Sequence, residues 1–136
     1  MAKSDSLLLL LSTIFVSTWS VSGKEKNSSS AIQDWNCCAA DIRINQWPSG
    51  YTAMNIPKFT VEVVNEAWMA TDGVFDVHIF CGEFASATLV NPMVFRRIGF
   101  GDCVLRDGGK IGMDEIISFD YSNILPYPLF AVHVRC

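Results

Sequence analysis

Short runs of alternating apolar and polar residues recur along this chain and limit its fold more than any other feature. In residues 58–65, the apolar residues Phe59, Val61 and Val63 alternate with polar neighbours. A period of two is typical of strands that bury one face. Comparable runs, with turn residues between them, occupy residues 41–46, 74–81, 103–106, 115–122 and 129–136.

A weaker strand is expected within residues 84–90 or 95–100, and residues 66–73 are expected to form a loop. In residues 74–81, one face of the strand is predicted to hold Phe75, Val77, Ile79 and Cys81. A helical period longer than a turn or two is not found after residue 36. The pattern predicts an all-β fold, a small antiparallel β-sandwich or barrel of about six to eight strands.

Residues 1–23 have the features of a secretory signal peptide. Lys3 precedes an apolar run from Leu7 to Trp19, and Val21 and Gly23 suit a signal-peptidase site. The run is shorter than the roughly 20 apolar residues that a membrane helix needs, so we expect cleavage and no membrane insertion of the mature chain. A signal anchor is the alternative. The prediction is a secreted protein.

Residues 24–36 are polar and lack periodicity, which predicts a flexible arm ahead of a domain at residues 37–136. The arm contains a glycosylation sequon at Asn27. The chain of 136 residues has a net charge of −4, and its basic residues are not clustered. Nucleic-acid binding requires a concentrated positive surface, so we expect no nucleic-acid partner.

Five cysteines follow the leader, at positions 37, 38, 81, 103 and 136. In an oxidising compartment they predict disulfide bonds, and an odd number leaves one cysteine over. Spacing alone does not choose the pairs. His78 and His133 each stand alone on a strand pattern, and no Cys-x-x-Cys motif is present. We therefore expect neither a metal site nor a cofactor.

Catalytic residue patterns are weak. Glu62, Asp76 and Asp120 fall on the polar phase of strands, where a solvated carboxylate is the default. Ser86 and Ser118 lack the glycine-flanked elbow that exposes a nucleophile. We expect a protein that is not an enzyme.

Aromatic residues are better candidates for a binding surface. Trp35, Trp47, Tyr51 and Trp68 are predicted to lie in loops, where flat rings can contact sugars or proteins. The alternative is that they close the open ends of the sandwich.

The basic pair Arg96 and Arg97 has three interpretations. It could contact a partner, serve as a dibasic processing site, or form one outward and one partly covered position of a strand. The candidate partner contacts from sequence are Trp47, Trp68, Arg96 and Arg97.

An ordered string of motifs resembles the tapetum determinant family of plants, from about residue 37 to the end of the chain. The motifs are Cys81-Gly82 with Phe84 and Ser86, Asn91-Pro92 with Phe95-Arg96, Asp102-Cys103-Val104, Asp107-Gly108, Phe119-x-Tyr121 with Asn123, Pro126-Tyr127-Pro128, and Cys136. The resemblance implies a small secreted cysteine-rich signalling protein. It implies no catalytic residues.

The resemblance also implies a role and a partner. The best-known family members act as extracellular ligands of a leucine-rich-repeat receptor kinase that sets tapetal cell fate in anthers, and others are described only as homologues of that ligand. Two alternatives remain: an apoplastic module that binds cell-wall carbohydrate through loop tryptophans, and a diverged hydrolase or inhibitor.

One segment departs from the family pattern. Relatives carry two further cysteines where this chain has Ala67 and Thr71. The loss of both together is expected if these two cysteines bridge each other in the relatives. The resemblance assigns Cys37 as the first family cysteine and Cys38 as the extra one. It implies two bridges among Cys37, Cys81, Cys103 and Cys136, with Cys38 unpaired.

Overall fold

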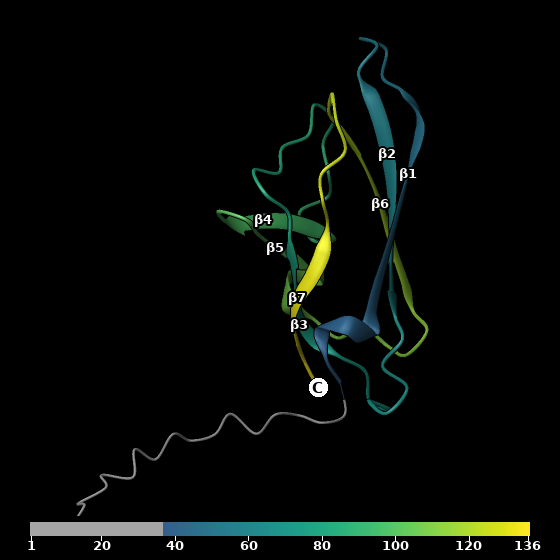
Figure 1. Ribbon diagram of the computed structural model, residues 1–136, viewed down its shortest axis with the longest axis vertical. Coiled ribbons are helices and arrows are strands. Elements are labelled where there is room, and N and C mark those ends of the chain that lie inside the picture. Colours follow the sequence, from purple (N-terminus) through teal and green to yellow (C-terminus); the bar gives the residue numbers. More distant parts are fainter. Residues whose placement is uncertain (1–36) are drawn as a thin grey trace, which may run out of the picture. The chain divides into compact units, whose positions relative to one another are not determined.

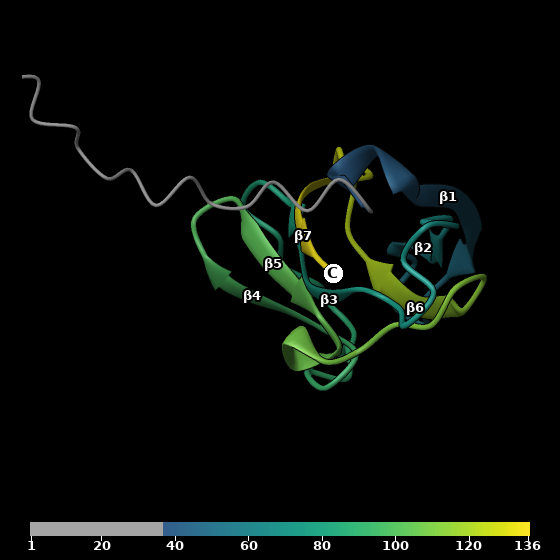
Figure 2. The same ribbon diagram turned by 90° about the horizontal axis from the view of Figure 1, so that it is seen from below.

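A computed structural model describes residues 37–136, which form two antiparallel sheets packed face to face (Figures 1 and 2). The strands are β1 (Ile42–Tyr51), β2 (Pro57–Asn65), β3 (Phe75–Phe80), β4 (Phe95–Gly99), β5 (Asp102–Leu105), β6 (Ile116–Ser122) and β7 (Phe130–Arg135). One sheet has the order β1-β2-β6 and the other β4-β5-β3-β7. The predicted small all-β sandwich with disulfides is confirmed.

Several predictions concern residues that the structure does not describe. The signal peptide at 1–23, the arm at 24–36, the sequon at Asn27 and the ring of Trp35 all lie outside residues 37–136. Within the described part of the chain, none of the helices has the length and apolar character needed to cross a bilayer.

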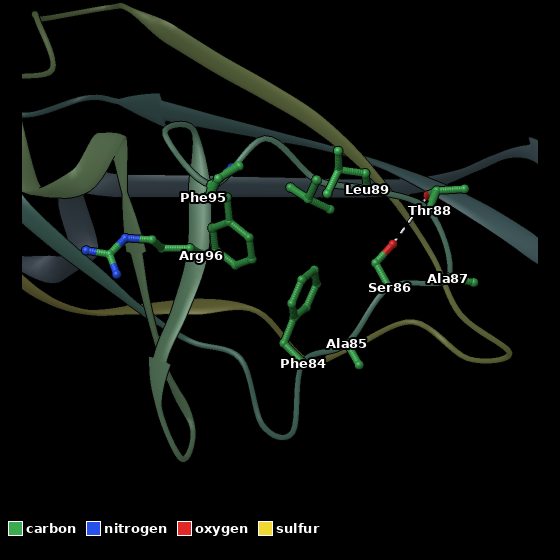
Figure 3. A pocket seen from close by; sticks show the side chains of 10 residues that line it. Phe84, Ala85, Ser86, Ala87, Thr88, Leu89, Phe95 and Arg96 are labelled. Carbon is green, nitrogen blue, oxygen red and sulfur yellow. Dashed lines mark hydrogen bonds between the residues drawn. The ribbon is translucent and has the colours of Figure 1, made fainter.

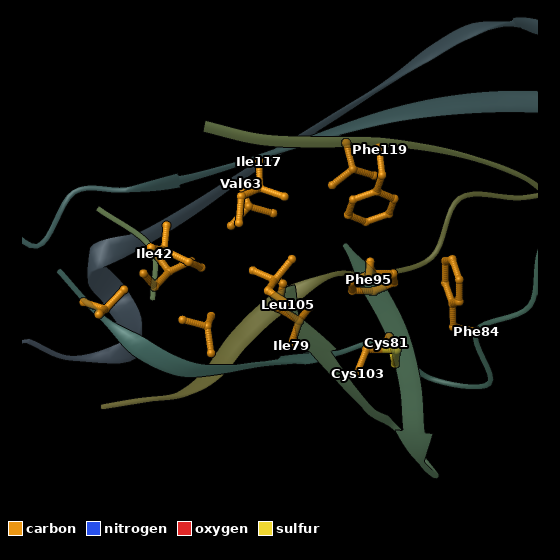
Figure 4. Packing of buried hydrophobic residues seen from close by; sticks show 14 of the residues in the cluster. Ile42, Val63, Ile79, Cys81, Phe84, Phe95, Cys103, Leu105, Ile117 and Phe119 are labelled. Carbon is orange, nitrogen blue, oxygen red and sulfur yellow. A yellow bond between two sulfur atoms is a disulfide. The ribbon is translucent and has the colours of Figure 1, made fainter. Parts of the chain in front are cut away.

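The core lies between the two sheets and is built around aromatic rings (Figure 4). Phe95 of β4 stacks on Phe119 of β6 with ring centroids 4.3 Å apart, which joins the two sheets. Phe84 meets Phe95 edge-on at 5.0 Å. Removing such apolar surface from water contributes about 25 cal/mol per Å². The alternation seen in residues 58–65 places Val61 and Val63 in this core.

Strand β1 is longer than its sequence pattern predicted. Residues 47–51 continue the strand, so the prediction that Trp47 and Tyr51 lie in loops is wrong. The register shifts between Pro48 and Gly50, and Gly50 has a φ of 128° that favours glycine. Pro48 lies in β1, an edge strand, which is where sheets accommodate a residue that lacks an N–H.

Strand β3 also contains a bulge, which corrects the face predicted for it. Asp76 has a φ of 51°, and the pairing with β7 shifts between Phe75 and His78. The shift turns Phe75 to a half-buried position, while Val74 is fully buried. Val77, Ile79 and Cys81 lie in the core as predicted. A local positive φ breaks a period of two, which the alternation of apolar residues could not reveal.

Of the two places considered for a weak strand, residues 95–99 form β4 and residues 84–90 do not form a strand. Residues 84–90 are instead hydrogen-bonded to Ser122 at the end of β6. The N–H of Ala87 donates to the carbonyl of Ser122 at 2.9 Å, and the N–H of Thr88 donates to the hydroxyl of Ser122 at 3.0 Å. These bonds satisfy backbone donors that a strand would have paired in a ladder.

A buried polar network links β1, β6 and the segment before β7. The hydroxyl of Tyr121 donates to Oε1 of Gln46 and accepts the N–H of Tyr127 at 2.9 Å. Nε2 of Gln46 donates to the carbonyl of Tyr127 at 2.9 Å. Burial raises the pKa of Tyr121 above 10.0, so the phenol stays protonated and able to donate. The motif residues Tyr121 and Tyr127 therefore have a structural role.

Candidate interaction surfaces

The two disulfides join Cys81 to Cys103 and Cys37 to Cys136. The first is fully buried and holds the end of β3 against β5. The second ties the start of the described chain to its last residue, with a sequence separation of 99. Cys38 carries a free, exposed thiol beside this second bridge.

The outer face of the three-stranded sheet carries Trp47 among polar groups, with Ile116 exposed at one end. Trp47 pairs with Thr60, and Thr60 pairs with Asp120 on the far strand. The hydroxyl of Thr60 donates to Oδ1 of Asp120 at 2.6 Å, and Trp47 is 40% exposed. The next row across this face holds Asn45, Glu62 and Ser118. A flat ring beside hydroxyl, amide and carboxylate groups has the chemistry to hold a sugar.

Trp68 lies in the loop after β2, as expected, and is 73% exposed. It follows the end of β2, while Trp47 pairs with Thr60, a separation of about 17 Å along the strand. The two tryptophans therefore do not form one platform. Ala67 in the same loop is buried, and its N–H donates to Oδ1 of Asn65 at 3.0 Å. Thr71 is exposed.

The outer face of the four-stranded sheet combines charged and aromatic rows. Both rows follow from the strand pairing. One row holds Arg96, Val104, His78 and His133, and the next holds Asp102, Phe80 and Phe130. Phe80 stacks on Phe130 with centroids 4.8 Å apart, and Phe130 is 52% exposed. We call this surface the histidine face.

The two histidines that stood alone in the sequence are neighbours in the fold. Nδ1 of His78 lies 2.8 Å from Oδ1 of Asp102, and its Nε2 lies 3.1 Å from Oδ1 of Asp76. Nε2 of His133 lies 3.4 Å from the other carboxylate oxygen of Asp76. The two imidazole rings meet edge to face at 5.5 Å. The cluster therefore joins β5, β3 and β7 across the sheet.

The cluster changes the acidity of its members. Partial burial alone would lower the pKa of His78, but its hydrogen bonds to Asp102 and Asp76 outweigh it and raise the pKa above 6.5. The hydrogen bond to His78 lowers the pKa of Asp76 below 3.8, and the charges of His133 and Arg135 act in the same direction. Sequence reasoning treated Asp76 as a solvated carboxylate and missed this cluster, since the bulge at Asp76 brings it together.

Arg96 and Arg97 both lie on β4 and are exposed, and the side chain of Arg96 is 45% exposed. Nε of Arg96 donates to Oδ1 of Asp107 at 3.1 Å, across the 3-10 turn at Arg106–Gly108. Nε of Arg97 donates to the carbonyl of Gly99 at 3.2 Å. Among the described residues, Arg97 forms no ion pair with a carboxylate. It pairs with Cys103, whose side chain lies in the core, so Arg97 is on the opposite side of the sheet from Arg96.

A shallow groove of about 420 Å³ lies between residues 84–92 and the start of β4 (Figure 3). The rings of Phe84 and Phe95 form its floor, and the hydroxyls of Ser86 and Thr88 lie 3.3 Å apart along one side. The guanidinium of Arg96 points away from the two rings. Because Ser86 also accepts the N–H of Ser122 at 2.9 Å, its hydroxyl is used in holding the loop.

The described residues contain no cluster of three or more His, Cys, Asp or Glu side chains that could hold a metal ion. Glu62 and Asp120 lie on the outer face of the three-stranded sheet, away from the two histidines on the other sheet.

The fold and its exposed faces define a small disulfide-bridged β-sandwich whose candidate sites are open sheet surfaces. A family model described as "Tapetum determinant 1, C-terminal" matches residues 38–136. The chain belongs to the tapetum determinant family, as its motifs indicated. No solved structure matches it significantly.

Three curated plant proteins are similar to this chain. TPD1 protein homolog 1B of Oryza sativa subsp. japonica is 43% identical over 105 residues, which cover 77% of this chain and 61% of that protein. TPD1 protein homolog 1 of Arabidopsis thaliana is 36% identical, covering 74% and 56%. TPD1 protein homolog 1A of Oryza sativa subsp. japonica is 37% identical, covering 76% and 48%. The matched region therefore spans about half to three fifths of these relatives.

Proposed function

We propose that this protein is a secreted plant signalling protein that acts as a ligand of a leucine-rich-repeat receptor kinase in anther or reproductive cell-fate determination. Membership of the tapetum determinant family over residues 38–136 carries the proposal. The proposal includes removal of residues 1–23, release into the apoplast, and glycosylation at Asn27. It assigns no catalytic role to the chain.

The described domain has features that suit a ligand. It is bridged by two disulfides, which suits a protein that works in an oxidising extracellular medium. It offers two open sheet faces rather than a deep cavity, and protein partners recognise such broad surfaces.

The test is binding of the secreted, disulfide-bonded protein to a panel of purified leucine-rich-repeat receptor ectodomains, measured by surface plasmon resonance. A dissociation constant near or below about 1 μM for at least one ectodomain is expected, and reduction of the disulfides should abolish it. Binding to none of the panel, by a protein shown to be folded, would overturn the proposal.

A second candidate function is binding of cell-wall carbohydrate, favoured by Trp47 on the outer face of the three-stranded sheet. Its ring lies in the row that holds Thr60 and Asp120. If this function holds, a glycan array should detect binding that Trp47→Ala abolishes. Trp68→Ala should have little effect, because Trp68 does not share the platform.

A further inference from the structure

We propose that one end of the sandwich, which carries no charged residues, binds a partner protein through apolar side chains of both molecules. This end consists of three loops, residues 51–57, 86–90 and 122–126, which lie at the top of Figure 1. We call it the loop end. The inference deepens the proposed function and rests on it for the partner being a protein.

Backbone hydrogen bonds hold the three loops side by side. The N–H of Asn123 donates to the carbonyl of Pro57 at 3.1 Å, which joins the third loop to the first. Ser122 accepts the N–H groups of Ala87 and Thr88, which joins the third loop to the second. The loops are therefore fixed in place before a partner arrives, which lowers the entropic cost of binding.

The polar side chains of these loops bond within the end and leave its surface to apolar ones. The hydroxyl of Thr52 accepts the N–H of Ile56 at 3.1 Å, and the hydroxyls of Thr88 and Ser122 lie 2.8 Å apart. Five large side chains of the loops are between 68% and 95% exposed: Tyr51, Met54, Leu89, Ile124 and Leu125. An exposed apolar group of this size on a small domain is typical of an interaction site.

Charge is absent from the segments that build this end. Residues 44–57, 84–95 and 121–132 contain no Asp, Glu, Lys or Arg, although the chain has 10 basic and 14 acidic residues. The loop that follows β2 at the opposite end carries Glu66 and Asp72. Charged residues are depleted at the centres of protein interfaces, where Tyr and Met are enriched. An uncharged apolar surface is therefore the partner chemistry that complements the loop end.

The groove of about 420 Å³ continues this surface (Figure 3). Leu89 of the loop end lines it, and the rings of Phe84 and Phe95 form its floor. Among its lining residues Arg96 alone is charged, and the guanidinium points away from the two rings. Pockets that hold small molecules have roughly 300–1,000 Å³, so the groove has room for an apolar side chain of a partner.

The area of the loop end disfavours a second copy of this chain as the partner. Burying one large apolar side chain removes on the order of 100 Å² from water, so the five exposed side chains offer about 500 Å². Two loop ends in contact would bury about 1,000 Å², less than the roughly 1,200–2,000 Å² of stable interfaces. A different protein that also fills the groove covers more.

A lipid surface fits less well than a protein. The basic residues that attract anionic lipids are absent from residues 44–57, 84–95 and 121–132. A bilayer surface also has no side chain to place between the walls of the groove. The geometry and the chemistry of the loop end therefore both favour a protein with apolar side chains.

The experiment uses an end-capped peptide of Leu and Gln as the probe, titrated into ¹⁵N-labelled protein. The same peptide with Ser in place of Leu is the matched probe. We expect amide shifts from the Leu peptide to cluster at Met54, Leu89 and Leu125, and no shifts from the Ser peptide. Raising the salt concentration should change the affinity by less than about twofold, because no ion pair forms.

Variants separate the loop end from the opposite end. Met54→Glu should weaken binding of the Leu peptide by about tenfold or more, because it places an unpaired charge in an apolar interface. Met69→Glu makes the same change in the exposed loop after β2, and should have an effect below about twofold. Both side chains are exposed, and the spectrum of each free variant checks that it is folded.

No binding of the Leu peptide, shifts centred on Thr60 or His133, or equal effects of the two methionine variants would overturn the inference. Two other occupants have their own tests. Co-sedimentation with phosphatidylcholine vesicles that Leu125→Glu abolishes would assign the loop end to lipid. A dimer that resists reduction and that Leu125→Glu dissociates, seen in sedimentation velocity, would assign it to a second copy. Either result would overturn the inference, and we expect neither.

Failure of the proposed function is a different outcome, because the peptide titration does not depend on any receptor. If a receptor ectodomain binds and Met54→Glu and Leu125→Glu leave that affinity unchanged, the proposed function stands and this surface is wrong. If no ectodomain binds while the Leu peptide binds at the loop end, the proposed function is wrong and the surface stands as a site for another protein.

Discussion

Tyr121 places a hydroxyl in the core and satisfies it with two groups from other segments. It donates to Gln46 and accepts from the N–H of Tyr127, while Gln46 also donates to the carbonyl of Tyr127. The sequence marked Tyr121 only as part of the motif Phe119-x-Tyr121, and it did not show which polar atoms would meet its hydroxyl. Those partners come from residues 75 and 6 positions away in the chain.

We predict that Tyr121→Phe lowers the free energy of unfolding by about 1–3 kcal/mol, since it leaves Gln46 Oε1 and the Tyr127 N–H without their partner. Urea denaturation followed by circular dichroism measures this. Tyr51→Phe is the matched control: Tyr51 is 68% exposed, so its loss should stay within about 0.5 kcal/mol. Equal losses for both variants would show that the buried network contributes nothing specific.

His78 should make stability depend on pH. Its pKa is raised in the folded protein, so its contribution is complete below its unfolded pKa of 6.5 and is lost as pH rises through the folded value. The pKa of Asp76 is lowered from 3.8, so its contribution is present above 3.8 and lost as pH falls through the lower folded value. We therefore expect the cluster to stabilise the folded protein most between pH 3.8 and pH 6.5, the ordinary pKa values of the two side chains.

The measurement is the urea midpoint at pH 5.5 and 7.5, which should be higher at pH 5.5. His78→Gln should flatten this difference while keeping a polar side chain at the site. A difference that survives unchanged in His78→Gln would assign the pH dependence to other groups.

At the scale of elements, the backbone irregularities decide which side chains meet. The bulge at Asp76 turns the start of β3 and allows Val74 to bridge to Ile111. Gly73 precedes this bridge with a φ of 91°, and a Cβ there would lie 2.7 Å from the carbonyl oxygen of Ile111. Neither feature follows from the alternation of residues 74–81, since a period of two assumes a regular strand.

Gly73→Ala should destabilise the protein by about 1–3 kcal/mol, through the positive φ and the clash with backbone. Gly99→Ala makes the same change where a Cβ meets nothing within 4 Å, and should shift stability by less than about 0.5 kcal/mol. Thermal denaturation of the two variants beside the wild type measures both. A harmless Gly73→Ala would mean that the loop adjusts without cost.

For the whole molecule, the bridge between Cys37 and Cys136 is the longest covalent constraint, with a separation of 99 residues. We predict that Cys37→Ala with Cys136→Ala lowers the free energy of unfolding by roughly 2–5 kcal/mol, because the unbridged unfolded chain has more freedom. Denaturant unfolding of the double variant measures it. A loss close to zero would show that the bridge does not constrain the unfolded state.

Alkylation of the folded, unreduced protein should modify one cysteine, Cys38, whose thiol is exposed. Mass spectrometry of the peptides after digestion locates the label. Label on Cys37, or Cys38 found in an intramolecular bridge, would contradict the pairing in the structure. A dimer that disappears on reduction and in Cys38→Ser would instead show that this thiol joins two chains.

The sequence by itself determined the fold class and the family. Alternation in short runs requires strands with one buried face, and the ordered motifs from Cys81 to Cys136 identify the tapetum determinant family without any coordinates. Both are properties of neighbouring residues or of their order, so they can be read along the chain.

Only the tertiary structure decided which distant residues share a surface. It placed Trp47 on a strand face apart from Trp68, and it joined His78 and His133 to Asp76 and Asp102. The physical reason is that pairing across strands depends on register, and a single bulge changes the register of everything beyond it.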